Sequence, residues 1–159
     1  MIKIEDKSKC SGCHSCYNVC PKHCITMIED QEGFWYPEVD KNQCIDCGLC
    51  EKRCPILNDM KVDNKPLAYA CYNKDESIRK ESSSGGVFTL LATLVIEQGG
   101  IVYGASFNDE HMVEHIEVDN VNDLNKLRGS KYVQSRIGDT YSKVREYLNK
   151  GRLVYFSGT

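Results

Sequence analysis

Residues 10–21 read Cys10-Ser-Gly-Cys-His-Ser-Cys-Tyr-Asn-Val-Cys-Pro21, and residues 44–55 read Cys44-Ile-Asp-Cys-Gly-Leu-Cys-Glu-Lys-Arg-Cys-Pro55. Both stretches follow C-x2-C-x2-C-x3-C-P, which is the ligand spacing of bacterial 4Fe-4S sites. At this spacing the first three thiolates can surround three corners of one cubane cluster. The fourth cysteine, followed by a proline that helps to set the exit direction of the chain, points toward the neighbouring cluster. The two stretches therefore predict two 4Fe-4S clusters.

This crossed arrangement divides the eight predicted ligands into two sets. One cluster takes Cys10, Cys13, Cys16 and Cys54, and the other takes Cys44, Cys47, Cys50 and Cys20. Because the second stretch repeats the first at an offset of 34 residues, we expect pseudo-two-fold symmetry.

Two other interpretations of the cysteines remain open. A structural zinc site is one, although zinc ribbons use separated C-x-x-C pairs and have no need for a third and fourth cysteine in each run. A disulfide framework is the other, since the chain has 10 cysteines in 159 residues. The opening residues 1–7 have no apolar core of the kind that a signal peptide needs.

Composition and charge narrow the function classes. A chain of 159 residues suggests one ordinary domain or two small ones. The longest apolar run, residues 87–96, is too short to cross a bilayer, so we expect no transmembrane segment. The formal charge of −3 becomes more negative with two oxidised clusters, each adding about −2, which argues against nucleic acid as a partner. Reduced thiols and exposed clusters indicate a reducing compartment, and we expect the cytoplasm.

Residues 1–57 are predicted to form an α+β, ferredoxin-like two-cluster module. Residues 25–28 and 34–36 read as short strands joined by a polar turn that ends in glycine. Cys24 is expected to be a small buried thiol near a cluster rather than a ninth ligand, and His14 and His23 are expected at the surface. The predicted apolar lining is Ile2, Ile4, Ile25, Ile28, Ile45 and Leu49.

Residues 58–66 are polar and end in proline, so they read as a linker. Residues 67–159 then alternate strand and helix patterns, which predicts an α/β domain. The expected strands are 67–72, 101–107, 115–119 and 153–156, and the expected helices are 87–96 and 141–148. Cys71 is expected in the core, and His111 and His115 in solvent. Since the chain stops directly after an apolar strand, we expect an incomplete α/β domain and a fragment of a longer protein.

Two loops of this second part could bind an anionic ligand. Residues 82–86, Ser-Ser-Ser-Gly-Gly, open a predicted helix, where hydroxyls can cap the first turn and free N–H groups favour a phosphate. Residues 128–132, Arg-Gly-Ser-Lys-Tyr, form a basic loop with an aromatic ring attached. Without further evidence, residues 82–86 are equally compatible with an ordinary capped helix, and residues 128–132 with a solvated turn. Residues 157–159 follow the carboxyl end of a strand, where open α/β sheets place ligands, and neither G-x-G-x-x-G nor G-x-x-x-x-G-K-[ST] occurs.

The chain resembles the beta-subunit family of coenzyme F420 hydrogenase/dehydrogenase. The resemblance is carried by the two cysteine runs and by residues 33–40, 82–88, 99–105, 128–132 and 156–159. It implies a ferredoxin-like segment in front of a flavin-binding domain, with FAD as the cofactor, and electron transfer between the clusters and the flavin. It also implies that the continuation of the family beyond residues 157–159 is missing here.

The resemblance implies flavin contacts but no catalytic residue. The implied contacts are Ser82, Ser83, Ser84, Gly85, Gly86, Ser130 and Lys131. We therefore expect part of a flavin-dependent oxidoreductase, with a redox partner protein or subunit and an unidentified small-molecule substrate, of which coenzyme F420 is one candidate. The alternatives are a ferredoxin-type electron carrier whose second part only docks a partner, and a scaffold tied to polysaccharide biosynthesis.

Overall fold

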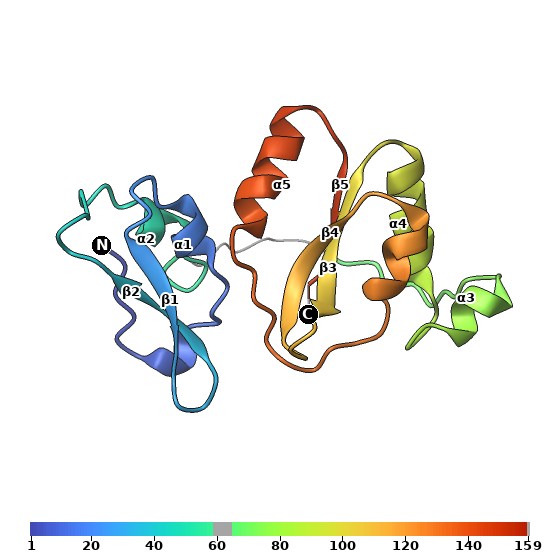
Figure 1. The fold of residues 1–159 in the computed structure, drawn as a ribbon, viewed down its shortest axis with the longest axis horizontal. Coiled ribbons are helices and arrows are strands. Elements are labelled where there is room, and N and C mark those ends of the chain that lie inside the picture. The colour runs from blue at the N-terminus through green and yellow to red at the C-terminus, as the bar shows by residue number, and fades with distance from the viewer. Residues whose placement is uncertain (59–64, 159) are drawn as a thin grey trace. The chain divides into compact units, whose positions relative to one another are not determined.

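The computed structural model describes residues 1–58 and 65–158. Residues 59–64 of the predicted linker lie outside the described residues. The chain packs as two compact units, Met1–Lys65 and Pro66–Thr159, each with its own hydrophobic cluster. Figure 1 shows both units and the elements named below.

The first unit consists of a β-hairpin and two short helices. Strand β1 (Ile25–Glu29) pairs antiparallel with β2 (Trp35–Val39), which confirms both strands predicted here. The turn between them is held by the carboxylate of Asp30, which accepts the backbone N–H groups of Glu32 and Phe34. A 3-10 turn η1 (Lys7–Lys9) precedes the first cysteine run.

The helices α1 (Ser15–Val19) and α2 (Leu49–Arg53) occupy equivalent positions in the two copies of the internal repeat. They pack against each other, and the last cysteine of each run is the C-cap of its helix. Each also follows a residue in the left-handed region, His14 at φ 59° and Gly48 at φ 70°. The equivalent backbone geometry at an offset of 34 residues is what a pseudo-symmetric module requires.

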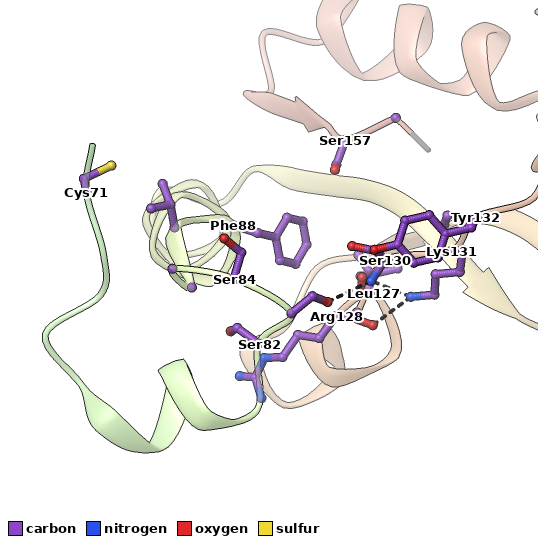
Figure 2. A pocket seen from close by; sticks show the side chains of 17 residues that line it. Cys71, Ser82, Ser84, Phe88, Leu127, Arg128, Ser130, Lys131, Tyr132 and Ser157 are labelled. Carbon is purple, nitrogen blue, oxygen red and sulfur yellow. Dashed lines mark hydrogen bonds between the residues drawn. The ribbon is translucent and has the colours of Figure 1, made fainter. Parts of the chain in front are cut away.

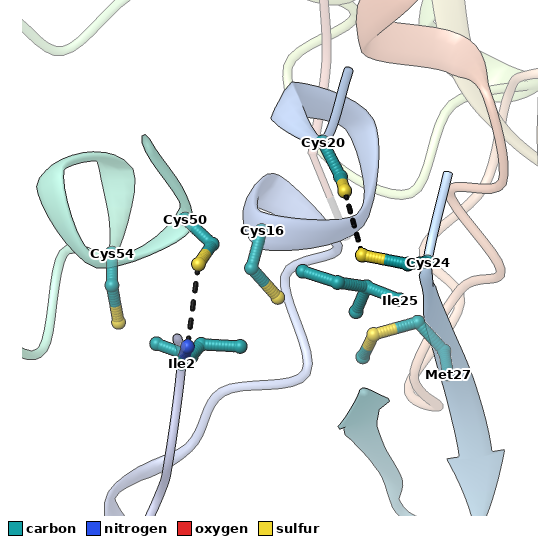
Figure 3. Packing of buried hydrophobic residues seen from close by; sticks show 8 residues of the cluster. All are labelled: Ile2, Cys16, Cys20, Cys24, Ile25, Met27, Cys50 and Cys54. Carbon is teal, nitrogen blue, oxygen red and sulfur yellow. Dashed lines mark hydrogen bonds between the residues drawn. The ribbon is translucent and has the colours of Figure 1, made fainter. Parts of the chain in front are cut away.

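The core of the first unit is built largely from sulfur. Its buried members are Ile2, Cys16, Cys20, Cys24, Ile25, Met27, Cys50 and Cys54, eight side chains that converge from both halves of the repeat (Figure 3). Ile2 and Ile25 therefore lie where predicted. Ile45 and Leu49 are exposed on one side, but they line a cavity beside Cys44, Cys47 and Cys50, as the predicted lining requires. Ile28 does not lie where predicted: it is 45% exposed and lines neither cavity of this unit. Ile28 lies on the outer face of β1, where alternation along a strand places it opposite Met27.

The second unit is organised around a three-stranded mixed sheet in the order β4-β3-β5. The central strand β3 (Ile101–Phe107) is buried for six of its seven residues. It pairs antiparallel with β4 (Val113–Val118) and parallel with β5 (Val154–Phe156). The strands predicted at 101–107, 115–119 and 153–156 are thus confirmed, with shifts of up to two residues at their ends.

Helix α4 (Val87–Glu97) covers the core of this unit, and α5 (Thr140–Asn149) leads into β5. Both helices agree with prediction to within two residues. Short elements that were not predicted are α3 (Glu76–Lys80) and the 3-10 turn η2 (Val121–Lys126). The core consists of Ala92, Val102, Val118, Leu124 and Leu127.

The strand predicted at residues 67–72 is wrong. This segment has no regular structure, and Leu67, Tyr69 and Tyr72 are exposed. The sequence pattern of a strand is insufficient when no neighbouring strand takes up its backbone groups. The chain instead meets the loop before α4, where the N–H of Asn73 donates to the carbonyl of Gly85 at 2.6 Å.

Over the described ranges 1–58 and 65–158, no helix combines the length and apolar character needed to cross a membrane.

Candidate functional site

The eight cysteines of the two runs surround two small cavities of the first unit. One cavity is lined by Cys10, Cys13, Cys16 and Cys54, among other residues. The other is lined by Cys20, Cys44, Cys47 and Cys50. The structure thus brings the eight cysteines together in the same two sets that the crossed spacing predicts, and the ligand assignment itself stays a prediction.

Hydrogen-bond donors reach the sulfur atoms of the second set. The backbone N–H of Ile2 donates to Sγ of Cys50 at 3.3 Å (Figure 3). Although burial tends to raise the pKa of Cys20, backbone N–H groups and the thiol of Cys24 outweigh it and lower that pKa. Cys24 is 5% exposed and its Sγ lies 3.4 Å from that of Cys20, which confirms the expected buried thiol. In the first set, burial raises the pKa of the Cys16 thiol to about 12, so binding of iron there must displace a proton.

Among the described residues, no three His, Cys, Asp or Glu side chains are arranged to hold a single metal ion. A cubane cluster makes a different demand, because each of its thiolate ligands binds a separate iron. The fit of these loops to a cluster is better tested by the polar groups beside them.

His14 is such a group, and its predicted surface position is wrong. Its side chain is 5% exposed, and burial lowers its pKa. It lines the cavity of the first cysteine set, and neither ring nitrogen has a hydrogen-bond partner among the described residues. A buried polar atom without a partner indicates a group that the protein itself does not supply. His23, in contrast, is exposed as predicted.

The second unit contains an open pocket of about 500 Å³. It is lined by residues 82–88 and 127–132 together with Cys71, Ala105, Ser157 and Gly158 (Figure 2). All seven predicted flavin contacts lie on its wall. This volume is typical of small-molecule sites. The pocket thus unites two loops that the sequence presents as unrelated.

Two sets of hydrogen bonds position the loop before α4. The hydroxyl of Ser83 accepts the backbone N–H of Ser130 at 2.9 Å, which ties this loop to residues 128–132. On the other side, Asn73 bonds the carbonyls of Gly85 and Gly86 through its backbone and side chain. Gly86 has φ 74°, and a Cβ there would lie 3.2 Å from Cβ of Asn73. Glycine suits this position because other residues would be strained and crowded.

The serine hydroxyls do not play the capping role expected of them. The N-cap of α4 is Gly86, which has no side chain, and the hydroxyl of Ser82 donates to the carbonyl of Ile78 at 2.7 Å. Gly86, Val87 and Phe88 line the pocket, so the first turn of an 11-residue helix borders it without a cap from its own N-cap residue. Such a turn favours a bound anion through its N–H groups and the helix dipole.

The two basic side chains of the second loop are engaged within the protein. Nζ of Lys131 donates to the carbonyls of Leu127 and Arg128 at 3.2 and 2.8 Å, as Figure 2 shows, and burial lowers its pKa. Arg128 is paired with the carboxylate of Glu81 and donates from Nε to the hydroxyl of Thr89. Both cations therefore hold the loop in place, while Tyr132, 93% exposed, presents its ring at the pocket.

Two residues of the second unit differ from expectation and bear on the pocket. Cys71 is exposed on the pocket wall and is not a core thiol, because its segment does not join the sheet. His115 is buried and not in solvent. Its Nε2 lies 3.0 Å from the carbonyl of Ser157, so Nε2 carries the proton and Nδ1 accepts from the hydroxyl of Ser135 at 2.7 Å.

The ring of His115 also stacks on that of Phe156, with centroids 5.0 Å apart. The imidazole thereby fixes the end of β5, from which Ser157 and Gly158 reach the pocket. Period-two alternation along β4, which places His115 on the same face as Val113, could have indicated this burial from sequence.

Two family descriptions match the chain. Residues 9–57 match the 4Fe-4S dicluster domain. Residues 68–140 match the N-terminal part of the coenzyme F420 hydrogenase/dehydrogenase beta subunit. The first match contains the eight cysteines, and the second contains both loops of the pocket.

Several curated proteins share part of the sequence. A 7Fe ferredoxin of Hydrogenibacillus schlegelii is 50% identical over 58 residues, covering 36% of this chain and 68% of the ferredoxin. An uncharacterized ferredoxin of Methanocaldococcus jannaschii is 42% identical over 52 residues, covering 33% of this chain and 66% of that ferredoxin. The pyruvate synthase subunit PorD of Methanothermobacter marburgensis is 39% identical over 51 residues, covering 32% of this chain and 53% of that subunit. The matches thus span about half to two thirds of these relatives.

These relatives and the first family match agree on a ferredoxin-like, iron–sulfur electron-transfer domain in the first unit. The second match covers most of the second unit. The second unit thus resembles the N-terminal part of the coenzyme F420 hydrogenase/dehydrogenase beta subunit over residues 68–140, and it follows a 4Fe-4S dicluster domain over residues 9–57, in agreement with the resemblance in the sequence.

Proposed function

We propose that the protein is the electron-transfer part of an iron–sulfur flavoprotein oxidoreductase. Two 4Fe-4S clusters in the first unit exchange electrons with a flavin that binds in the pocket of the second unit. The observation that carries the flavin assignment is the meeting of residues 82–86 and 128–132 in one pocket of about 500 Å³.

The cluster half of the proposal draws on the cavities of the first unit. Each is lined by four cysteines of the two runs, three from one run and the last from the other, which is the arrangement that crossed ligation needs; Cys24 also lines the cavity of the second set. Ile2 supplies an N–H to Cys50, and such donors to ligand sulfur atoms stabilise the reduced, more negative cluster.

The flavin half draws on the donors around the pocket. The first turn of α4 and the exposed Ser84 can donate to phosphate oxygens. The ring of Tyr132 is available to stack on an aromatic ligand. Lys131 contributes by holding the second loop against the carbonyls of η2 and its flanking residues.

A bound flavin supplies the ability to take one or two electrons, and so it links single-electron transfer to hydride chemistry. The residues of this chain bind and orient it. The deazaflavin coenzyme F420 is the first electron acceptor or donor to test, because the family description that matches residues 68–140 is named for it.

The second candidate function is a ferredoxin-type carrier without flavin chemistry of its own. It is favoured by the identity of 50% to a ferredoxin, which concerns a part of the chain only. The two candidates differ in one measurable property, which is flavin affinity.

Anaerobic reconstitution separates them. The full chain is loaded with iron and sulfide, titrated with FAD and with FMN, and analysed for iron, acid-labile sulfide and bound flavin, with EPR of the dithionite-reduced state. About eight irons per chain and one tightly bound flavin are expected. Ser84→Asp, which places a negative charge on the pocket wall beside the first turn of α4, should weaken flavin binding and leave the iron content unchanged.

Three outcomes decide the proposal. Eight irons without flavin affinity for either form would overturn the flavoprotein assignment and favour the carrier. Zinc in place of iron would overturn both. The third outcome is a bound flavin that is reduced by the dithionite-loaded clusters but does not reduce F420. It would support the flavoprotein assignment and exclude F420 as the substrate.

A further inference from the structure

The two halves of the cluster module differ at one equivalent position. The residue directly before helix α1 is His14, with φ 59° and ψ 8°, and the residue directly before α2 is Gly48, with φ 70° and ψ 2°. Glycine adopts this left-handed conformation readily, whereas a residue with a Cβ is strained there. The first half therefore has a strained residue, His14, at the position where the second half has the unstrained Gly48.

The imidazole of His14 is also enclosed. The side chain is 5% exposed and lies beside the rings of Tyr17 and Trp35, at centroid distances of 6.0 and 6.3 Å. Nδ1 and Nε2 are both buried and have no hydrogen-bond partner among the described residues. Leaving a buried polar group unpaired is unfavourable, so strain and desolvation both act against a histidine here.

The position of the ring shows which group could satisfy it. His14 lines the cavity whose wall also contains Cys10, Cys13, Cys16 and Cys54. Filling space alone would be served by an apolar residue without the desolvation penalty. An N–H donor is useful at this wall because the sulfur atoms of a cluster gain negative charge on reduction.

We propose that His14 donates an N–H hydrogen bond to a sulfur atom of the cluster held by the first cysteine set, and thereby raises the reduction potential of that cluster. The inference rests on the proposed cluster binding. When one electron enters from a low-potential donor, the added charge is shared by the cluster sulfur atoms; the hydrogen bond strengthens, and the proton stays on the imidazole. His14 is a positioning and tuning residue, not an electron carrier.

The test is an EPR-monitored redox titration of the reconstituted full chain, with dithionite as reductant. His14→Leu removes the donor at similar size, His14→Asn keeps an N–H donor and tolerates the left-handed backbone, and His14→Gly copies Gly48. The matched control is His23→Leu, because His23 is also left-handed, at φ 49°, but exposed and outside both cysteine cavities.

We expect one of the two cluster potentials to fall in His14→Leu and in His14→Gly while the other stays constant. A tenfold change in the reduction equilibrium corresponds to 59 mV for a one-electron couple, and a shift of at least this order is expected. His14→Asn should retain part of the potential, and His23→Leu should leave both unchanged.

Iron and sulfide analysis distinguishes the possible failures. If the wild-type chain binds no cluster, the proposed function fails before the role of His14 is reached. The role of His14 is refuted, while the cluster assignment stands, if all variants retain about eight irons but neither potential moves in His14→Leu. It is refuted equally if His14→Leu shifts both potentials together, or if His23→Leu shifts them as much as His14→Leu does.

Discussion

The backbone N–H of Ser130 donates to the hydroxyl of Ser83 at 2.9 Å, which joins loops that are 47 residues apart in the sequence. This bond closes one side of the pocket in the second unit. Neither loop has a strong ligand-binding pattern alone, so their contact is the link between two weak sequence signals.

Removal of the Ser83 hydroxyl should weaken ligand binding more than folding. In Ser83→Ala the N–H of Ser130 can bond to water, because both residues are exposed, and the free energy of unfolding should fall by less than about 1 kcal/mol. The flavin Kd should rise about threefold to tenfold as the loops separate. Fluorescence titration measures it; Ser83→Thr keeps the hydroxyl and should bind as wild type does. Equal affinity in Ser83→Ala would show that the loop contact does not shape the site.

Gly85→Ala should destabilise the second unit. The added Cβ would lie 2.7 Å from the carbonyl oxygen of Cys71 and 3.3 Å from Cα of Tyr72, and both are backbone atoms that cannot turn aside. We expect a loss of about 1–3 kcal/mol, measured by urea unfolding without flavin. Gly158→Ala is the control, since its Cβ meets nothing within 4 Å. Two variants of equal stability would contradict the close packing at Gly85.

Crossed ligation predicts a specific pattern in paired cysteine variants. Cys54→Ala should remove the cluster that Cys13 also holds, so Cys13→Ala/Cys54→Ala should keep about four irons. Cys47→Ala/Cys54→Ala should lose both clusters, because Cys47 lines the other cavity. Uncrossed ligation would reverse the two iron contents. Cys71→Ala, which lies outside the module, should keep all eight.

His115 should make the stability of the second unit depend on pH. Burial lowers the pKa of its imidazole, although the hydrogen bond to Ser157 opposes this effect. The unfolded chain then binds a proton near the usual pKa of about 6.5, while the folded chain binds one only at lower pH. Stability is therefore complete above about pH 6.5 and declines as the pH falls below it.

His115→Gln should be less stable than wild type at pH 7.5 and should show a shallower decline between pH 6.5 and 5. Urea unfolding at several pH values measures both slopes. Parallel slopes in the two proteins would mean that the titration of His115 does not contribute.

Local patterns predicted much of each unit. The β-hairpin, helix α4, helix α5 and the three strands of the sheet follow from alternation, helical spacing and glycine boundaries, which are properties of short segments. The strand predicted at residues 67–72 is absent because a strand pattern forms a strand only where a partner strand is available. The segment instead leads to Asn73, whose N–H donates to the carbonyl of Gly85. The prediction for Ile28 failed because alternation along β1 places it on the face opposite Met27, away from the core.

The sequence by itself determined the cluster chemistry, since ligand type and spacing within each cysteine run are encoded in a dozen consecutive residues. Tertiary structure alone decided which distant groups meet. It placed Ser83 against Ser130, the imidazole of His115 at the end of β5, and the unpartnered nitrogens of His14 beside four cysteines. These relationships depend on how separate elements pack, and packing is a property of contacts between residues far apart in the chain.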